Sequence, residues 1–141
     1  MTLDHVVAPS TPPKGPEHYL TSDQCMSCHD GQGAPFGPNM VIPADDTHAG
    51  VNLSPFGEWN WSMMGLAGRD PIFYAQLESE NALWPPKAGM IDNLCLTCHG
   101  AMGQRQWHAD GSAENYTLDK LLIRDVNDPD HKYGALSRDG I

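Results

Sequence analysis

The sequence has few basic residues and no long hydrophobic run. Lys and Arg together number 8 in 141 residues, against 18 Asp and Glu, which gives a formal net charge of −10. Nucleic acids and anionic membranes are bound through basic surfaces, so we expect neither as a partner. No segment approaches the roughly 20 consecutive apolar residues of a transmembrane helix, so we expect no membrane span in this chain.

Side chains that build a hydrophobic core are also scarce. Hydrophobic residues make up 40% of the chain, whereas Gly (14) and Pro (12) are both frequent. A chain of this length is expected to form one domain, but its composition predicts short helices joined by long loops. Side chains alone would hardly form a hydrophobic core in such a chain. A large apolar cofactor would supply the missing buried apolar surface.

No segment shows the polar–apolar alternation that is typical of a strand. We therefore expect a mostly α-helical fold with long irregular loops, forming a compact domain over residues 17–141. The first sixteen residues contain four prolines, which predict an extended N-terminal arm over residues 1–16.

The strongest helical pattern begins at Ser54, a suitable N-cap, and apolar residues then recur at helical spacing until Gly68. A second helix is predicted to start at once, with Asp70 as its cap and Pro71 in the first position. At Thr21, the T-x-x-Q spacing predicts a capping box. Further short helices are expected over residues 93–99, 117–124 and 129–137, with loops over 30–53 and 82–92.

All four cysteines lie in two C-x-x-C-H motifs, Cys25–His29 and Cys95–His99. This pattern is the c-type haem attachment signature. Two cysteines three residues apart on a helical turn can form thioethers with the two vinyl groups on one porphyrin edge. The histidine that follows then binds the iron as the proximal ligand. We therefore predict two haem c groups, held by Cys25, Cys28, Cys95 and Cys98, with His29 and His99 on the irons.

Zinc and disulfide chemistry are the competing explanations for these cysteines. Zinc sites usually separate their two C-x-x-C pairs by about 12 to 20 residues, and here Cys28 and Cys95 are several times farther apart. A disulfide or redox dithiol leaves the histidine after each pair unexplained. The repeated C-x-x-C-H pattern therefore favours haem.

The sixth ligand of each iron decides what such haems do. Methionine or histidine in that position is typical of electron transfer, whereas an open position lets the iron bind a substrate. Met63 and Met64 lie mid-helix among tryptophans and glycines, which suit a flat porphyrin face, although the same residues would also fit a simple core stripe. The remaining candidates are Met102, which starts on the proximal side of its own haem, and the histidines of two polar loops, His48 and His108.

Four further stretches accompany the two motifs. They are Ser54-Pro55-Phe56-Gly57-Glu58-Trp59, Ser62-Met63-Met64, Ala67-Gly68-Arg69-Asp70-Pro71 and Cys98-His99-Gly100-Ala101-Met102-Gly103. Together with the motifs, they resemble the multihaem c-type cytochrome family. The resemblance implies that Met64 is the distal ligand of one haem. Residues 133–141 are similar to the run that leads into a further C-x-x-C-H in such proteins, which implies that the chain is a segment of a longer multihaem protein.

Electron transfer through two covalently attached haems is the function we expect, as a carrier or as a relay subunit of a redox complex. A haem enzyme of the reductase or peroxidase type, with one open iron, is the alternative. The negative charge predicts redox partner proteins with a basic docking surface.

Residues 1–16 lack the basic start and apolar run of a signal peptide, whereas haem is attached to C-x-x-C-H outside the cytoplasm. We therefore expect a mature or trimmed sequence from the periplasm or another extracytoplasmic compartment.

Overall fold

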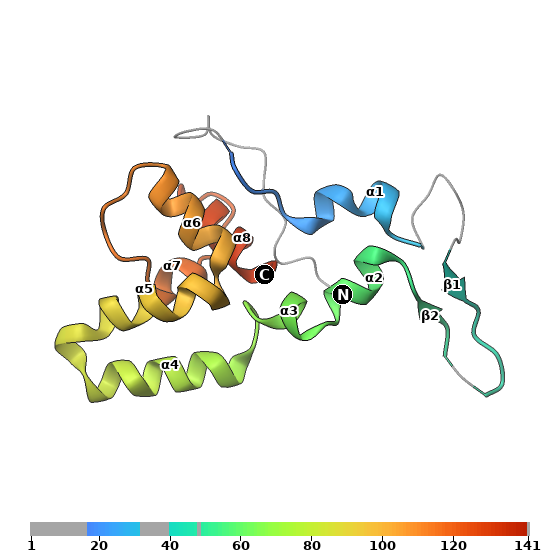
Figure 1. Cartoon of the computed structure of the whole chain (residues 1–141), viewed down its shortest axis with the longest axis horizontal. Coiled ribbons are helices and arrows are strands. Elements are labelled where there is room, and N and C mark those ends of the chain that lie inside the picture. The colour runs from blue at the N-terminus through green and yellow to red at the C-terminus, as the bar shows by residue number, and fades with distance from the viewer. Residues whose placement is uncertain (1–16, 32–39, 48, 141) are drawn as a thin grey trace.

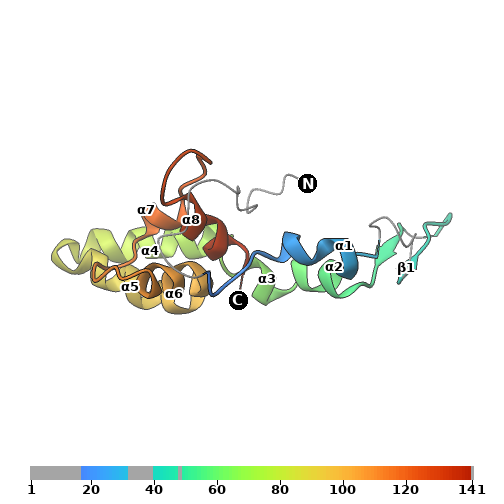
Figure 2. The same ribbon diagram turned by 90° about the horizontal axis from the view of Figure 1, so that it is seen from above.

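Helices predominate in the computed structural model, which describes residues 17–31, 40–47 and 49–140. The expected mostly α-helical class is therefore confirmed. The predicted arm over residues 1–16 lies outside the described residues. The elements form two lobes that lie end to end along the long axis of the molecule (Figures 1 and 2).

The N-terminal lobe contains short helices and a two-stranded antiparallel ribbon. Within the region predicted to be a loop, Val41 pairs with Asn52 and Ile42 pairs with Val51. This short ribbon is a departure from the expected absence of strands. The elements are the 3₁₀ helix η1 (Ser22–Cys25), α1 (Met26–His29), β1 (Val41–Ile42), β2 (Val51–Asn52), α2 (Pro55–Asn60) and α3 (Met63–Leu66).

The helix predicted from Ser54 to Gly68 is divided into α2 and α3. Ser54 caps α2 as expected, because its side chain accepts a hydrogen bond from the Gly57 amide. Ser62, however, is a second N-cap: its backbone is extended and its hydroxyl accepts the Gly65 amide at 3.0 Å. The Arg69 guanidinium then joins the two helices, donating to the Gly65 carbonyl at 2.7 Å. The apolar spacing suggested one helix, but a local cap interrupts it.

The C-terminal lobe is built on a helical hairpin in which α4 and α5 lie side by side (Figure 1). Asp70 caps α4 as predicted, accepting the Ile72 amide at 2.8 Å. The loop predicted over residues 82–92 is wrong, because helical structure continues through most of it, and α6 was not predicted. The elements are α4 (Pro71–Leu83), the 3₁₀ helix η2 (Pro85–Lys87), α5 (Ala88–His99), α6 (Ala101–Ala109), α7 (Leu118–Leu121) and α8 (His131–Arg138).

The hydrophobic core lies entirely in the C-terminal lobe. Its buried side chains come from α4 to α8 and their connections: Leu77, Leu96, Trp107, Tyr116, Leu118, Leu121 and Tyr133. In the N-terminal lobe, no hydrophobic side chain among the described residues is buried. Trp61 and Met63 of that lobe are 67% and 87% exposed, respectively. Buried hydrophobic side chains, expected to be scarce from the composition, are thus lacking among the described residues of the N-terminal lobe.

Helix α8 packs closely against the start of α6, and this contact depends on a glycine. A Cβ atom at Gly103 would overlap the Ser137 hydroxyl and the Tyr133 carbonyl oxygen. Gly68, at the end of the α3 turn, likewise lies directly against the Ser137 carbonyl. The backbone of α8 therefore approaches both segments at a distance that excludes a side chain.

Replacing Gly103 with alanine is expected to destabilise the protein by at least about 2 kcal/mol, because the added methyl group forces α8 away from α6. Gly89→Ala is the matched control: it also lies in a helix, but its Cβ would find only Asn115 atoms at 3.5 Å or more. That change should be neutral or stabilise by about 0.5–1 kcal/mol. Thermal unfolding followed by circular dichroism measures both, and equal effects would contradict the packing described.

Candidate functional site

The second C-x-x-C-H motif forms the last turn of α5. Cys95 and Cys98 are three residues apart on the helix, so their sulfur atoms lie on neighbouring parts of one face. Cys98 is exposed and Cys95 is half-buried at the edge of the core. Burial raises the pKa of the Cys95 thiol, and the nearby Asp92 and Glu80 carboxylates raise it further. This environment favours the neutral form of the free Cys95 thiol.

The His99 imidazole is fixed by contacts with two other segments. Its Nδ1 atom lies 3.2 Å from the carbonyl oxygen of Ala67, which directly follows α3. Because a carbonyl oxygen only accepts, Nδ1 is the donor in this contact, and in the neutral imidazole this leaves the lone pair on Nε2. Metal-bound histidines usually have this arrangement, with the second ring nitrogen hydrogen-bonded to a carbonyl or a carboxylate.

Phe73 of α4 fixes the plane of the same imidazole. The two rings are stacked with centroids 3.8 Å apart and an interplanar angle of 7°. Phe73 itself is partly buried against the hydrophobic core, so the imidazole rests on a supported surface. Neither Phe73 nor Ala67 was predicted as a site residue. Their distance from His99 in the sequence leaves no periodic signal that would reveal the contact.

The first motif spans η1 and α1 and is more open. Cys25, Cys28 and His29 are all exposed. Helix α1 is joined to the rest of its lobe by the Asp30 carboxylate, which accepts a hydrogen bond from the Asn52 amide at 2.6 Å. The predicted capping box at Thr21 is not formed, because the Thr21 hydroxyl makes no capping bond to the helix backbone.

The two motifs lie in different lobes (Figures 1 and 2). All four cysteines are free thiols. In the described part of the chain, no three His, Cys, Asp or Glu side chains come together as a metal-binding group. Among the described residues, the cysteines of the two motifs are thus not gathered at one point, and the two motifs are separate.

Both sites fit a flat, apolar group attached at one edge. On α5, Met90 and Leu94 precede Cys98 at intervals of four residues and are 55% and 70% exposed, so an uncovered apolar stripe leads to the cysteine. Around the first motif, the lobe has exposed apolar residues, and none of its described hydrophobic side chains is buried. The donor set also fits, with two thiols at one helical turn and an adjacent imidazole in each case.

The predicted distal ligands differ in their surroundings. Met63 and Met64 lie on α3 and are 87% and 55% exposed, and Met102 is half-buried in the first turn of α6. His108 lies in the last turn of α6, so its predicted placement in a loop is wrong. Both of its ring nitrogens are engaged, Nδ1 with the Ser112 carbonyl at 2.9 Å and Nε2 with Asn93 Oδ1 at 3.1 Å. His48 lies outside the described residues.

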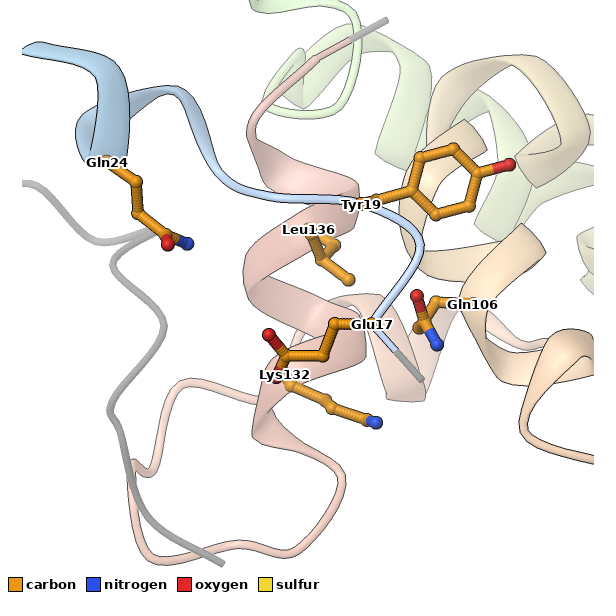
Figure 3. Close-up of a pocket in the computed structure, with 6 residues that line it drawn as sticks. All are labelled: Glu17, Tyr19, Gln24, Gln106, Lys132 and Leu136. Atoms are coloured by element: carbon orange, nitrogen blue, oxygen red, sulfur yellow. The ribbon is translucent and has the colours of Figure 1, made fainter. Parts of the chain in front are cut away.

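A small pocket lies between the segment that leads into η1 and helix α8 (Figure 3). It is lined by Glu17, Tyr19, Gln24, Gln106, Lys132 and Leu136. Its empty volume of about 240 Å³ includes open solvent and is below the roughly 300–1,000 Å³ of small-molecule sites. None of the six residues belongs to the predicted haem set, although Gln24 directly precedes Cys25 in η1.

None of the described helices is long and apolar enough to cross a membrane. Comparisons of the chain with protein-family models, with curated proteins and with solved structures found no match. The functional interpretation therefore depends on the residues of this chain.

Proposed function

We propose that this chain transfers electrons through two covalently attached c-type haems, as a carrier or as a relay subunit of a redox complex. Cys25 and Cys28 would hold one haem and Cys95 and Cys98 the other, with His29 and His99 as proximal ligands. The haem supplies a one-electron iron centre, and the protein contributes ligand choice, burial and spacing. The proposal carries with it membership of the multihaem c-type cytochrome family.

The arrangement of His99 is the observation that carries the proposal. A histidine that follows a C-x-x-C pair has its Nδ1 proton directed at a carbonyl, its ring plane fixed by Phe73, and the Nε2 lone pair left for a metal. A histidine with a purely structural role would not require an oriented ring, an unoccupied Nε2 atom and two adjacent thiols together. The missing core of the N-terminal lobe supports a haem at the first motif as well, because a porphyrin would cover apolar surface there.

Electron transfer is favoured over catalysis by the supply of distal ligands. Met63 and Met64 are exposed on α3, in the lobe that carries the first motif, and a methionine ligand raises the haem reduction potential. His108 is the less suitable candidate because both ring nitrogens already have partners.

The same proposal accounts for location and partners. Covalent haem attachment to C-x-x-C-H implies an extracytoplasmic compartment, such as the periplasm. The net charge of −10 favours a redox partner with a basic docking surface, because complementary charge speeds the encounter of two proteins.

Removal of one cysteine pair should leave one haem per chain. In cells that attach haem c, the native protein should carry two haems that survive denaturation, whereas Cys25→Ala/Cys28→Ala and Cys95→Ala/Cys98→Ala should each carry one. The alkaline pyridine spectrum, together with the mass of the denatured chain, gives the count. If the full-length protein carries no covalent haem under these conditions, the proposal is refuted, and zinc or disulfide chemistry becomes the explanation for the cysteines.

Loss of the Phe73 ring should change only the second haem. In Phe73→Ala, the His99 imidazole loses its stacking partner, so it would be a less firmly held ligand and would stabilise the ferric haem less. We expect the reduction potential of one haem to rise by about 60 mV or less, since 59 mV corresponds to tenfold for one electron. A redox titration measures this shift.

Ile72→Ala is the control for the same measurement, because Ile72 is the neighbouring residue on α4 and is 78% exposed. It should leave both potentials unchanged. Equal shifts in the two variants, or a shift in both haems of Phe73→Ala, would argue against a specific role for the stacked ring.

A further inference from the structure

Within three residues, the end of α8 bonds to a segment next to each of the two candidate haem motifs. Ser137 donates a hydrogen bond from its hydroxyl to the carbonyl of Gly100, the residue after His99, at 3.1 Å. Two residues later, Asp139 accepts two hydrogen bonds from Ser22, three residues before Cys25. Figures 1 and 2 show the end of α8 where the two lobes meet.

The contact between Asp139 and Ser22 is a helix cap supplied from the other end of the chain. Asp139 Oδ2 accepts the Ser22 backbone amide at 2.7 Å, and Oδ1 accepts the Ser22 hydroxyl at 2.7 Å. Ser22 is the first residue of η1, whose usual cap position, Thr21, makes no side-chain capping bond. The carboxylate thus satisfies a first-turn amide that the local sequence leaves open.

The Asp139 side chain is not a surface group that happens to reach Ser22. Asp139 is 2% exposed, and Ser137 and Arg138 before it are fully buried. The carboxylate accepts both Ser22 hydrogen bonds at a position shielded from water, where hydrogen bonds are stronger than at the surface. The segment of residues 137–139 is therefore a firm connection between the two lobes.

We infer that Asp139 is a positioning residue that sets the distance and orientation between the two haem groups. This inference depends on the proposed function, because it concerns the haems that the two motifs would carry. Ser137 holds the segment that follows the second motif, and Asp139 holds the helix that ends in the first. The N-terminal lobe has no buried apolar residue among those described, so its placement depends on such polar contacts.

The experiment compares Asp139→Ala with Asp119→Ala in the full-length protein carrying its haems. Both variants lose one carboxylate from the C-terminal lobe, but Asp119 is exposed on α7. Two readouts are used. Amide hydrogen exchange of residues 22–29 reports on the cap and does not require haem. The magnetic interaction between the two ferric haems, measured by electron paramagnetic resonance, reports on their spacing.

In Asp139→Ala, amides of residues 22–29 should exchange about tenfold faster or more, as expected when charge-assisted hydrogen bonds are lost. The magnetic interaction should change, while haem content and the optical spectrum of each haem stay as in the native protein. Asp139→Asn keeps one acceptor oxygen and should restore part of the protection. Ser22→Ala, which removes only the hydroxyl bond, provides an intermediate case should Asp139→Ala fail to fold.

Exchange in residues 22–29 that matches the Asp119→Ala control would overturn the inference, as would an unchanged magnetic interaction in Asp139→Ala. If the protein carries no covalent haem but Asp139→Ala still speeds amide exchange, the proposed function and the positioning of haems are both refuted. Asp139 would then be a helix cap with a structural role only. The two failures are therefore distinguishable.

Discussion

The arrangement of the two lobes depends on the close packing of α8 against two segments that contain glycine. At Gly103 the helix approaches α6, and at Gly68 it approaches the connection between α3 and α4, in both cases without room for a Cβ atom. This contact brings residues 137–139 to the point where the two lobes meet. Ser137 and Asp139 can then bond to the segments that carry the two C-x-x-C-H motifs. Shifting α8 by the width of a methyl group would separate these partners.

The two lobes are stabilised by different kinds of contact. The C-terminal lobe buries aromatic and leucine side chains from α4 to α8 around one core. The N-terminal lobe is held by helix caps and polar bonds, such as those of Ser62 and Asp30, and many of its described apolar residues are exposed. Burial of apolar surface is the main favourable contribution to folding. A covalently attached porphyrin at Cys25 and Cys28 would provide that burial, which connects the proposed function to the unusual distribution of the core.

Those parts of the fold that local chemistry controls were predictable from the sequence. Ser54 and Asp70 act as the caps that their positions suggested. Residues 82–92 were wrongly predicted to be a loop, because proline is common in loops. Here Pro85 and Pro86 begin a 3₁₀ helix, where a missing amide proton has no cost. Helix α6, which packs against α8, was overlooked in the sequence.

The candidate site was predictable to a similar extent. The cysteines and histidines that we propose as haem ligands are identified from C-x-x-C-H alone. The contacts that orient His99, by contrast, come from Ala67 and Phe73, which lie far away in the chain and reach it only through the tertiary fold. Distal ligands depend on the same long-range geometry. For this reason the sequence left Met63, Met64, Met102, His48 and His108 as alternatives.

The optical spectrum of the ferrous protein, recorded before and after addition of carbon monoxide, tests the central claim most directly. Our account predicts the bands of c-type haem, unchanged by carbon monoxide, because both irons are closed by a sixth ligand. The absence of haem bands would contradict haem attachment altogether. A prompt spectral shift would show that one iron is open, which contradicts a pure electron-transfer role and favours a haem enzyme.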